Sequence, residues 1–321
     1  MLGFVGPMLR RTSGLAAVAA ALLLVACSRD GDHHGAVAPS ADPPAPATTD
    51  DAAPAAPAAR TFATAAEAVQ AVLDQTHPRV VGFGEQHELR GATVQSALTR
   101  FDRDIAPALI PHLSDLIVEI WARDACGDKS AAVNHNVQQM TQRPATTENE
   151  VVKLMTMTKE GGVQNHVIHL SCADYDSILD GKGEVDYEKL LLLVTDRLFQ
   201  VANGVLTARD AKGPPAPGRT LIALYGGALH NNLYPYQSTA DLTYAPRLSK
   251  RAGDHYVEID LYVPELIEND QLLRSEDWYP VFQKQQSTER VALIQRGPRS
   301  YILILRKGLA KPAPAAPAVP R

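Results

Sequence analysis

Short apolar runs alternate with segments of helical periodicity through the middle of the chain. The apolar runs have the length and the β-branched content of buried strands, and they lie at 79–84, 115–121, 165–171 and 219–225. Apolar residues recur at helical spacing between them, at 65–77, 92–110 and 187–207, and two polar helices are expected between 121 and 165. Strands that alternate with helices predict βαβ units, and therefore an α/β fold with a mainly parallel sheet and flanking helices.

Turn and cap residues refine this pattern. Thr64 and Glu67 form a capping box that opens the first helix, and Thr147 and Glu150 form a second one that opens the later polar helix. Near the C-terminus, 255–263 is strand-like, and the runs 290–295 and 300–306 flank Gly297-Pro298. The last two runs predict an antiparallel C-terminal hairpin at one edge of the sheet.

The N-terminus resembles a bacterial lipoprotein signal peptide. Arg10 and Arg11 precede an apolar stretch that is shorter than the ~20 residues a membrane span needs, and Leu24-Val25-Ala26-Cys27 has small residues before a cysteine. We therefore expect residues 1–26 to be removed and Cys27 to carry lipid. Because Ser28 rather than Asp follows that cysteine, the enterobacterial sorting rule favours the outer membrane, with the protein facing the periplasm or the cell surface.

Composition divides the remaining chain into three parts. Residues 27–60 and 310–321 are rich in Ala and Pro without a repeating apolar face, which predicts a disordered linker and a disordered tail. Residues 61–309 are long enough for one folded domain. The net charge of −5 becomes more negative when Arg10 and Arg11 are removed. A basic face for nucleic acid is not expected, so the predicted contact with a membrane is the lipid anchor alone.

Candidate chemistry lies at the carboxyl ends of the predicted strands, where open α/β sheets gather their sites. Glu85 and His87 follow the first strand within the motif Gly84–His87, and Gly227–His230 repeats the Gly-X-X-His pattern after the fourth strand. Glu119 and Arg123 end the second strand, and Asp174 and Tyr175 follow the third. The two motifs, with Glu119 between them, are the strongest constellation in the chain.

Two imidazoles and one or two carboxylates support two kinds of chemistry. Glu85, His87, Glu119 and His230 could hold a divalent metal with an open position, and that metal would lower the pKa of a bound water for hydrolysis. Without metal, a carboxylate can fix the tautomer of a histidine that activates water. Both alternatives imply a small-molecule or peptide substrate.

The segments Val80–Glu88 and Leu221–His230, followed by Pro235, resemble the early and late motifs of the superfamily that joins ChaN-like haem-uptake lipoproteins, erythromycin esterases and Tiki/TraB proteins. The resemblance covers about 79–235. The Gly-Glu-Gln-His form and the leader favour the ChaN-like branch. The esterase branch implies catalytic glutamates, which Glu85 and Glu119 match, and a positioned arginine, for which Ser96 stands here and Arg90 or Arg123 would have to substitute.

The resemblance implies a haem-binding uptake lipoprotein as the alternative to a metal-assisted hydrolase. Haem would need an axial ligand, and Tyr175, Tyr225, Tyr234 and Tyr236 lie near predicted strand ends, where a phenolate could bind ferric iron. The chain has only 6 Phe and 2 Trp, which leaves few side chains to stack on a porphyrin and favours the polar, metal-type site.

The cysteines other than Cys27 predict a disulfide. Cys126 and Cys172 each follow a predicted strand by a few residues, and an oxidising compartment would join them. Neither lies in a Cys/His signature of a nucleophile. His166 and His169 face opposite sides of one strand, so they are not expected to share a metal.

Overall fold

The computed structural model describes residues 58–88, 90–121, 126–144, 146–268, 270–285, 289–308 and 310. The predicted leader, Cys27, Arg123 and the tail after Ala310 lie outside the described residues. Strand β1 (Ala58–Phe62) includes Ala58, Ala59 and Arg60, which sequence analysis placed in the linker.

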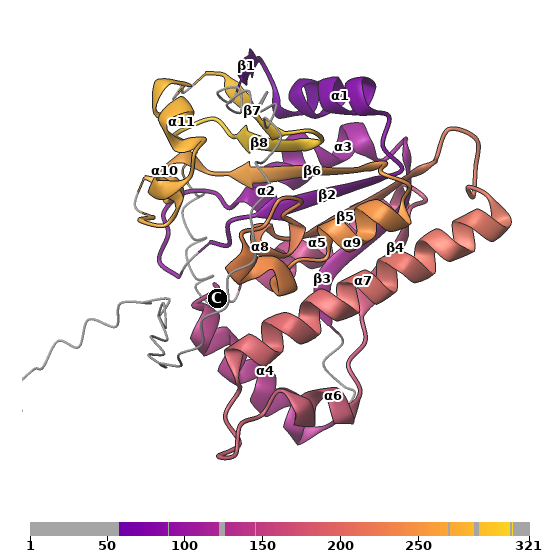
Figure 1. The fold of residues 1–321 in the computed structure, drawn as a ribbon, viewed down its shortest axis with the longest axis vertical. Coiled ribbons are helices and arrows are strands. Elements are labelled where there is room, and N and C mark those ends of the chain that lie inside the picture. The colour runs from indigo at the N-terminus through magenta and orange to yellow at the C-terminus, as the bar shows by residue number, and fades with distance from the viewer. Residues whose placement is uncertain are drawn as a thin grey trace, which may run out of the picture. The chain divides into compact units, whose positions relative to one another are not determined.

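The core of the fold is an eight-stranded sheet with strand order β1-β7-β8-β6-β2-β5-β3-β4. Five neighbouring pairs are parallel, from β8 through to β4, and β7 is antiparallel to both β8 and β1. The strands after β1 are β2 (Val80–Glu85), β3 (Leu113–Trp121), β4 (Gln164–Ile168), β5 (Leu221–Gly227), β6 (Tyr256–Tyr262), β7 (Val291–Gly297) and β8 (Ser300–Ile304). The predicted α/β class, mainly parallel sheet and C-terminal hairpin are confirmed (Figure 1). Strand β1, which was not predicted, extends the antiparallel edge.

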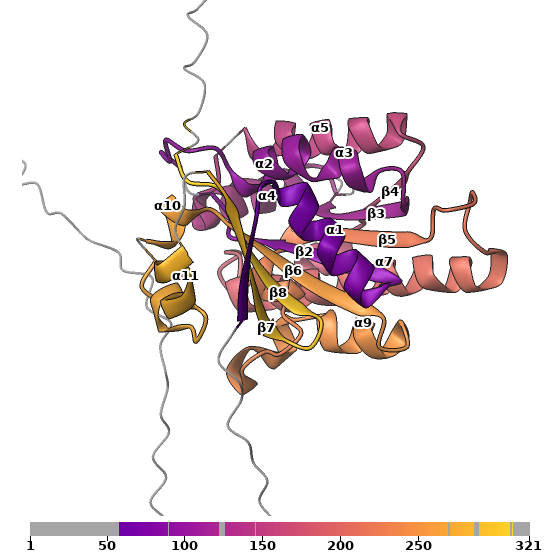
Figure 2. The same cartoon turned by 90° about the horizontal axis from the view of Figure 1, so that it is seen from above.

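Helices cover both faces of the sheet (Figure 2). One face is packed by α1 (Ala65–Thr76), α2 (Ala97–Asp104), α3 (Ala106–Leu109) and α5 (Thr147–Glu160), whose apolar residues share a core with Val81, Phe83 and Val118. The other is packed by α4 (Asp128–Thr141), α6 (Cys172–Ser177), α7 (Tyr187–Lys212) and α9 (Ala245–Arg251). A smaller core joins α10 (Pro264–Ile267) and α11 (Tyr279–Gln285) to β7 and β8. The short elements are α8 (Ala228–Asn231), η1 (Gln237–Leu242) and η2 (Leu273–Ser275).

The predicted helix over 92–110 is two helices in the structure. Ser96 caps α2, its hydroxyl accepting from the Thr99 N–H at 2.9 Å, and the first helix ends before Ile105. Pro107 then stands in the first turn of α3. A proline is tolerated there because it lacks only an N–H that the helix does not use, whereas it would break the interior of one continuous helix.

The predicted capping box at Thr147 and Glu150 is wrong. The N-cap of α5 is Thr146, and its side chain makes no capping bond. Glu150 instead accepts a hydrogen bond of 2.7 Å from the Ser96 hydroxyl, a contact between α5 and the start of α2. Local spacing could not reveal it, because the better partner of Glu150 comes from another helix.

The strand predicted at 165–171 ends at Ile168, and Ser171 opens α6 with a capping box. The Ser171 hydroxyl accepts from the Asp174 N–H, and the Asp174 carboxylate accepts from the Ser171 N–H at 2.8 Å. The Asp174 carboxylate also pairs with Arg197 at 2.5 Å. Asp174 is therefore engaged in holding α6 and α7 together.

The disulfide between Cys126 and Cys172 is present, with Cα atoms 5.5 Å apart. It joins the segment that precedes α4 to the first residue of α6. An ion pair between Lys129 and Asp176 links the same two helices. Helix α4 leads directly into the loop that carries Arg143, so this linkage bears on the site described below.

Among the described residues, α7 is the one helix long and apolar enough to cross a membrane by length and composition. Its apolar side chains Leu190, Val194 and Leu198 are buried in the core of the sheet. A core helix of an α/β domain has the same properties, and its packing here accounts for them.

Candidate functional site

The two Gly-X-X-His motifs lie side by side at the carboxyl end of the sheet. Strands β2 and β5 are adjacent and parallel, and Gly84 is in register with Gly226 and Glu85 with Gly227. Their histidines therefore emerge at the same edge of the sheet, as the strand order in Figure 1 shows. The predicted site residues Glu85, His87, Glu119 and His230 all lie in this region.

The glycines of these strands provide room for helix α8. A Cβ on Gly84 would lie 2.7 Å from the Ala228 Cα, and a Cβ on Gly82 would lie 1.9 Å from the Asn231 side-chain oxygen. A Cβ on Gly227 would lie 2.8 Å from Nε2 of His87. None of the three has a positive φ. These positions require glycine for close approach, and α8 consequently sits directly on the sheet.

Glu85 and His87 form a carboxylate–imidazole pair. Nδ1 of His87 donates to Oε1 of Glu85 at 2.8 Å, and the Tyr225 hydroxyl donates to the other oxygen at 2.7 Å. Glu85 is 7% exposed and Tyr225 is 4% exposed, so the carboxylate is held between two buried or half-buried partners. Burial, followed by the charge of Glu85, raises the pKa of Tyr225 well above its usual value, and its hydroxyl stays protonated as a donor.

Glu119 lies between the two histidines. Its Oε2 accepts from the Gly227 N–H at 2.6 Å, and its Oε1 is 4.0 Å from Nε2 of His230. Burial alone would raise its pKa, but His230, His87, Arg143 and the Gly227 N–H together hold the pKa of Glu119 below its usual range. Glu119 is therefore a carboxylate.

The tautomer of His230 follows from its partners. Nδ1 lies 2.9 Å from the Leu242 carbonyl oxygen and 2.8 Å from the Thr195 hydroxyl. Since a carbonyl oxygen can only accept, Nδ1 carries the proton and donates it. The other ring nitrogen, Nε2, then faces Glu119, and in the neutral form of the ring it carries the lone pair. His230 is 3% exposed, so this orientation is enclosed by protein.

Arg143 is a site residue that sequence analysis missed. Its Nη2 donates to Nε2 of His87 and lies 3.8 Å from Oε1 of Glu119. It comes from the loop between α4 and α5, 56 residues from His87 in sequence, and no motif marks it. Of the arginines predicted for this role, Arg90 is exposed and Arg123 lies outside the described residues.

A pocket opens beside this arrangement. It combines His87 and Arg143 with Ser96 and Glu150, which are bonded to each other. Its lining residues are Glu85, His87, Glu88, Ser96, Leu98, Arg143, Thr147 and Glu150. The space between these side chains is too narrow to admit a water molecule as it stands, so His87 becomes accessible from this side only when a lining side chain moves.

The side chains at this site are of the types that bind metal ions, but they are not arranged around a common metal position. Nε2 of His87, Nε2 of His230 and the Glu119 carboxylate are ligands that zinc-type ions accept. In the described part of the chain, however, no group of three or more His, Cys, Asp or Glu side chains is placed to hold a metal ion. The Arg143 guanidinium stands between His87 and Glu119, so a cation is already present there.

The tyrosines predicted as haem ligands are engaged elsewhere. Tyr175 is 0% exposed within the core under α7, and the hydroxyl of Tyr225 is bonded to Glu85. Tyr234 lies against Gly297 and donates to the Pro298 carbonyl at 2.6 Å. Tyr236, which is 60% exposed, lies 3.4 Å from the Glu276 carboxylate. The structure does not gather these phenols around one apolar slot.

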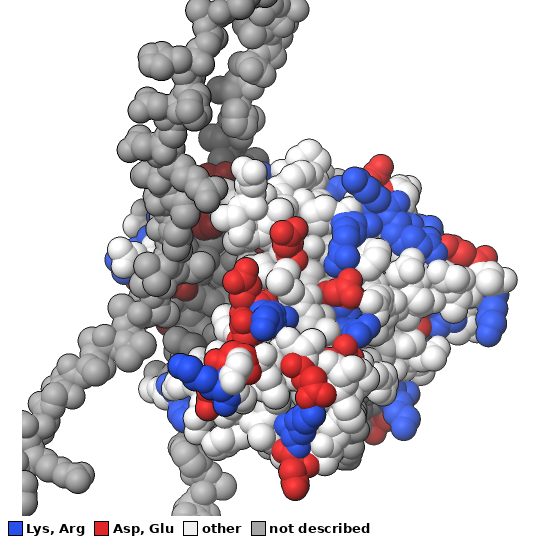
Figure 3. All heavy atoms as spheres, turned by 60° about the horizontal axis from the view of Figure 1, so that its bottom comes forward, with Lys and Arg blue, Asp and Glu red and all other residues white. Residues whose placement is uncertain are grey.

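The charged surface is mixed. Over the face shown in Figure 3, acidic and basic side chains lie beside one another, with a cluster of basic side chains at one corner. Ion pairs elsewhere in the described residues include Arg247–Asp196 at 3.3 Å and Arg251–Asp210 at 2.9 Å. Such neighbours offset each other's charge.

Comparisons with known proteins return distant likenesses. No protein-family model matches the sequence, and no curated protein matches it. The structure of the type III effector HopBA1 is similar with a TM-score of 0.40 and 12% identity, over 80% of this chain and 100% of that one. The crystal structure of a Bacillus cereus protein is similar with a TM-score of 0.33 and 11% identity, over 71% of this chain and 88% of that one. Neither likeness carries an argument about the site.

Proposed function

We propose that this protein is a hydrolase that activates water at His87. The observation that carries the proposal is the paired orientation of the two imidazoles. Each ring is bonded through Nδ1 to a protein acceptor, so each has its Nε2 lone pair directed toward the region of Glu119 and Arg143. Two bases with fixed tautomers beside a carboxylate and a guanidinium are a set suited to general acid–base chemistry.

His87 is the base in this proposal. Its side chain is 28% exposed and lines the pocket, whereas His230 is enclosed. The Glu85 carboxylate stabilises the imidazolium that forms when Nε2 takes a proton from water, as the third member of a catalytic triad does. Water must replace the Arg143 guanidinium at Nε2 for this step, and Arg143 can remain beside Glu119 when it does.

Arg143 and His230 complete the roles. A guanidinium that faces the pocket can stabilise the negative charge that develops on a carbonyl or phosphoryl oxygen under attack. His230, whose Nε2 faces the Glu119 carboxylate, can take up a proton at that nitrogen and pass it to the leaving group. The proposed substrate is a small molecule or peptide with a hydrolysable ester or amide bond.

A metal-assisted form of the same hydrolase is the second version of this proposal. Nε2 of His87, Nε2 of His230 and Glu119 would hold a divalent ion if Arg143 moved away, and the ion would supply an activated water at neutral pH. We rank it second because the present arrangement places a protein cation against these ligands. We rank haem binding below both forms because of where the four tyrosines lie.

We also propose that the domain is anchored in the cell envelope through a lipid on Cys27. The sequence of the leader carries this proposal, and the Cys126–Cys172 disulfide supports it, because disulfides persist in oxidising compartments such as the periplasm.

Hydrolysis of chromogenic esters, amides and phosphate esters tests the function, with and without EDTA. We expect at least one substrate to be turned over in both conditions, and Glu85→Gln to lower kcat/KM on the order of 10²-fold or more. Glu160→Gln, the same change on the exposed end of α5, is the matched control. Activity that EDTA abolishes would favour the metal-assisted form. A substrate hydrolysed equally by wild type, Glu85→Gln and His87→Ala would overturn the proposed site. A Soret shift at stoichiometric haem would instead favour haem binding.

A further inference from the structure

The residue after His230 in α8 is a buried amide with every hydrogen-bonding group in use. Asn231 is 0% exposed. Its Nδ2 donates to the Gly82 carbonyl at 3.1 Å and to Oδ1 of Asp260 at 2.9 Å. Its Oδ1 accepts from the hydroxyls of Tyr256 and Tyr244. An amide has two donor hydrogens and two acceptor lone pairs, so Asn231 is satisfied on all sides.

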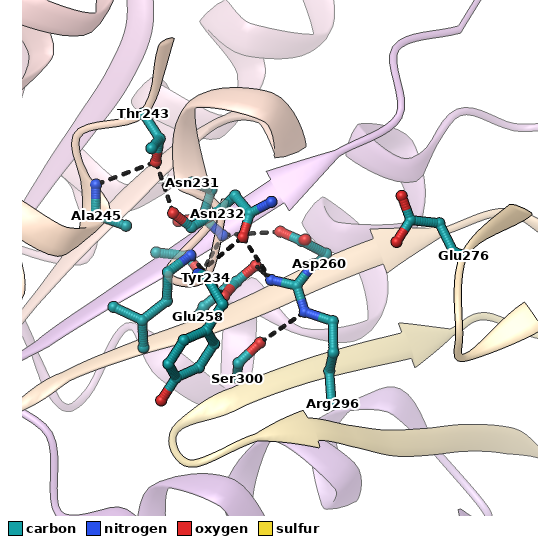
Figure 4. A network of polar contacts seen from close by, with 12 residues as sticks. Asn231, Asn232, Tyr234, Thr243, Ala245, Glu258, Asp260, Glu276, Arg296 and Ser300 are labelled. Carbon is teal, nitrogen blue, oxygen red and sulfur yellow. Dashed lines mark hydrogen bonds and ion pairs between the residues drawn. The ribbon is translucent and has the colours of Figure 1, made fainter. Parts of the chain in front are cut away.

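These partners come from three parts of the fold. Gly82 belongs to β2, Asp260 and Tyr256 to β6, and Tyr244 precedes α9. Figure 4 shows Asn231 and Asn232 lying over Asp260 and Glu258 of β6. Because Gly82 has no side chain, the Asn231 amide can reach the backbone of the central strand. A four-residue helix has little stability of its own, so these contacts determine where α8 lies.

The chain after α8 is held to the same strand. Oε2 of Glu258 accepts from the Leu233 N–H at 2.9 Å, and Arg296 donates to Oε1 of Glu258 at 2.6 Å and to Oδ1 of Asn232 at 2.8 Å (Figure 4). The Thr243 hydroxyl donates to the His230 carbonyl at 2.9 Å. These bonds hold the backbone of α8 and of the residues that follow it. The Asn231 side chain determines where α8 packs on the sheet.

His230 depends on this placement. Its Nε2 is 4.0 Å from Glu119, and its Nδ1 bonds reach Thr195 in α7 and the Leu242 carbonyl. A small shift of α8 would change the ring's distance to Glu119, because Glu119 is held at the end of β5 by the Gly227 N–H and has no hydrogen bond to the described turn of α8 that carries His230. We propose that Asn231 is a positioning residue that fixes the ring of His230 against Glu119. The expected effect of Asn231 on a reaction rate rests on the hydrolase proposed above. The expected effect of Asn231 on the orientation of the His230 ring does not depend on that proposal.

The test compares the same substitution at two adjacent residues. Asn231→Asp keeps the shape but replaces the donating group with an oxygen that faces the Gly82 carbonyl and Asp260. Asn232→Asp keeps an oxygen that accepts from Arg296 and from the Tyr234 N–H, so it is the matched control. With ¹⁵N-labelled histidine, two-bond ¹H–¹⁵N spectra at one pH report the tautomer and surroundings of each ring, and His230→Gln assigns the signal.

We expect wild type and Asn232→Asp to show His230 protonated at Nδ1 with the same ring shifts. In Asn231→Asp the His230 signals should move while those of His166 stay, because His166 is bonded to Asp115 away from α8. If a substrate is found, kcat should fall on the order of tenfold or more with KM unchanged. A folded Asn231→Asp protein with unchanged His230 signals would overturn the proposal.

A milder variant covers failure of Asn231→Asp to fold. Tyr256→Phe removes one donor to Oδ1 of Asn231 and keeps the ring in the core. It should move the His230 signals in the same direction by a smaller amount, and unchanged signals would again contradict the proposal. If no substrate is hydrolysed but the His230 signals respond, the hydrolase proposal fails and the positioning role stands.

Discussion

The guanidinium of Arg143 donates a hydrogen bond to Nε2 of His87, the ring nitrogen that a metal ion or a reacting water would need. The same guanidinium lies 3.8 Å from Glu119. Arg143 therefore offsets the negative charge of Glu119, which lies between the two histidines. A metal ion bound at these ligands would have to displace this guanidinium, so a mutation that removes Arg143 distinguishes the metal-free mechanism from the metal-assisted one.

Replacing Arg143 with methionine should convert the site into one that binds a divalent metal. The change removes the guanidinium and leaves Nε2 of both histidines and the Glu119 carboxylate available as ligands. These three groups are a zinc-type donor set. We expect Co²⁺ to bind Arg143→Met with visible absorption bands of a low-coordinate site, and wild type to bind far less. Arg247→Met, at an exposed arginine, should behave as wild type. Stoichiometric Co²⁺ on wild type that is lost in His87→Ala would support the metal-assisted form instead.

Asp102 should make the folded protein less stable as the pH rises. It is 3% exposed, its Oδ1 has no hydrogen-bond partner, and burial raises its pKa to about 7. Since the pKa in the unfolded chain is about 3.9, the folded state binds the proton more tightly, and stability falls between about pH 4 and pH 7. We expect Asp102→Asn to be more stable than wild type at pH 8, by up to about 4 kcal/mol, and similar to it near pH 4.

Urea unfolding at the two pH values measures this difference. Asp104→Asn, at the end of the same helix, is the control for removing a carboxylate from α2. If Asp102→Asn is equally or less stable than wild type at pH 8, then the ionised carboxylate is accommodated by the core and the expectation is wrong.

Asp115 should have the opposite pH dependence. It is 1% exposed, and although burial would raise its pKa, hydrogen bonds from His166, Arg209 and Ser114 lower the pKa to about 2. The folded pKa lies below the unfolded value of about 3.9, so its stabilisation is present above about pH 4 and is lost as the pH falls toward 2. Asp115→Asn should therefore cost about 2.5 kcal/mol at pH 7 and progressively less below pH 4.

Denaturant midpoints across this pH range provide the measurement. Asp241→Asn, an exposed change in η1, should show no such trend. A constant difference between Asp115→Asn and wild type from pH 7 to pH 2 would show that packing, rather than ionisation, determines the effect.

Loss of the Cys126–Cys172 disulfide should destabilise the domain. For a loop of sequence separation 46, the chain-entropy estimate is about 4 kcal/mol. We expect a lower thermal midpoint for Cys126→Ser/Cys172→Ser, and no further change when a reductant is added to that variant. Because α4 leads to Arg143, the variant should also bind substrate less well. Equal midpoints for wild type and variant under oxidising conditions would contradict this prediction.

The fold was largely predictable from sequence because buried helices and strands each require apolar residues at a characteristic spacing. The apolar runs at β2, β3, β5 and β6 and the helical stripe of α7 each appear in the sequence, and their alternation specifies a parallel sheet. Strand β1 and the break between α2 and α3 were not predicted. Strand β1 is short and follows an Ala/Pro segment, and it becomes a strand because β7 offers an open edge.

The candidate site was predictable where its residues follow strands. Glu85, His87, Glu119 and His230 were found because the carboxyl ends of parallel strands meet at one edge, and the register of Gly84 with Gly226 brings their motifs together. Arg143 and the Ser96–Glu150 contact were not, because loop and helix positions carry no period that links them to a strand end.

The class of fold, the pair of Gly-X-X-His motifs and the two cysteines able to pair could be read from local sequence patterns. The group that faces His87, the nitrogen of His230 that keeps its proton and the position of α8 over Gly82 depend on tertiary packing. Local patterns record which residues are buried and where strands end. Partners far apart in the chain meet only after packing, and here those partners set the charge and the tautomers of the site.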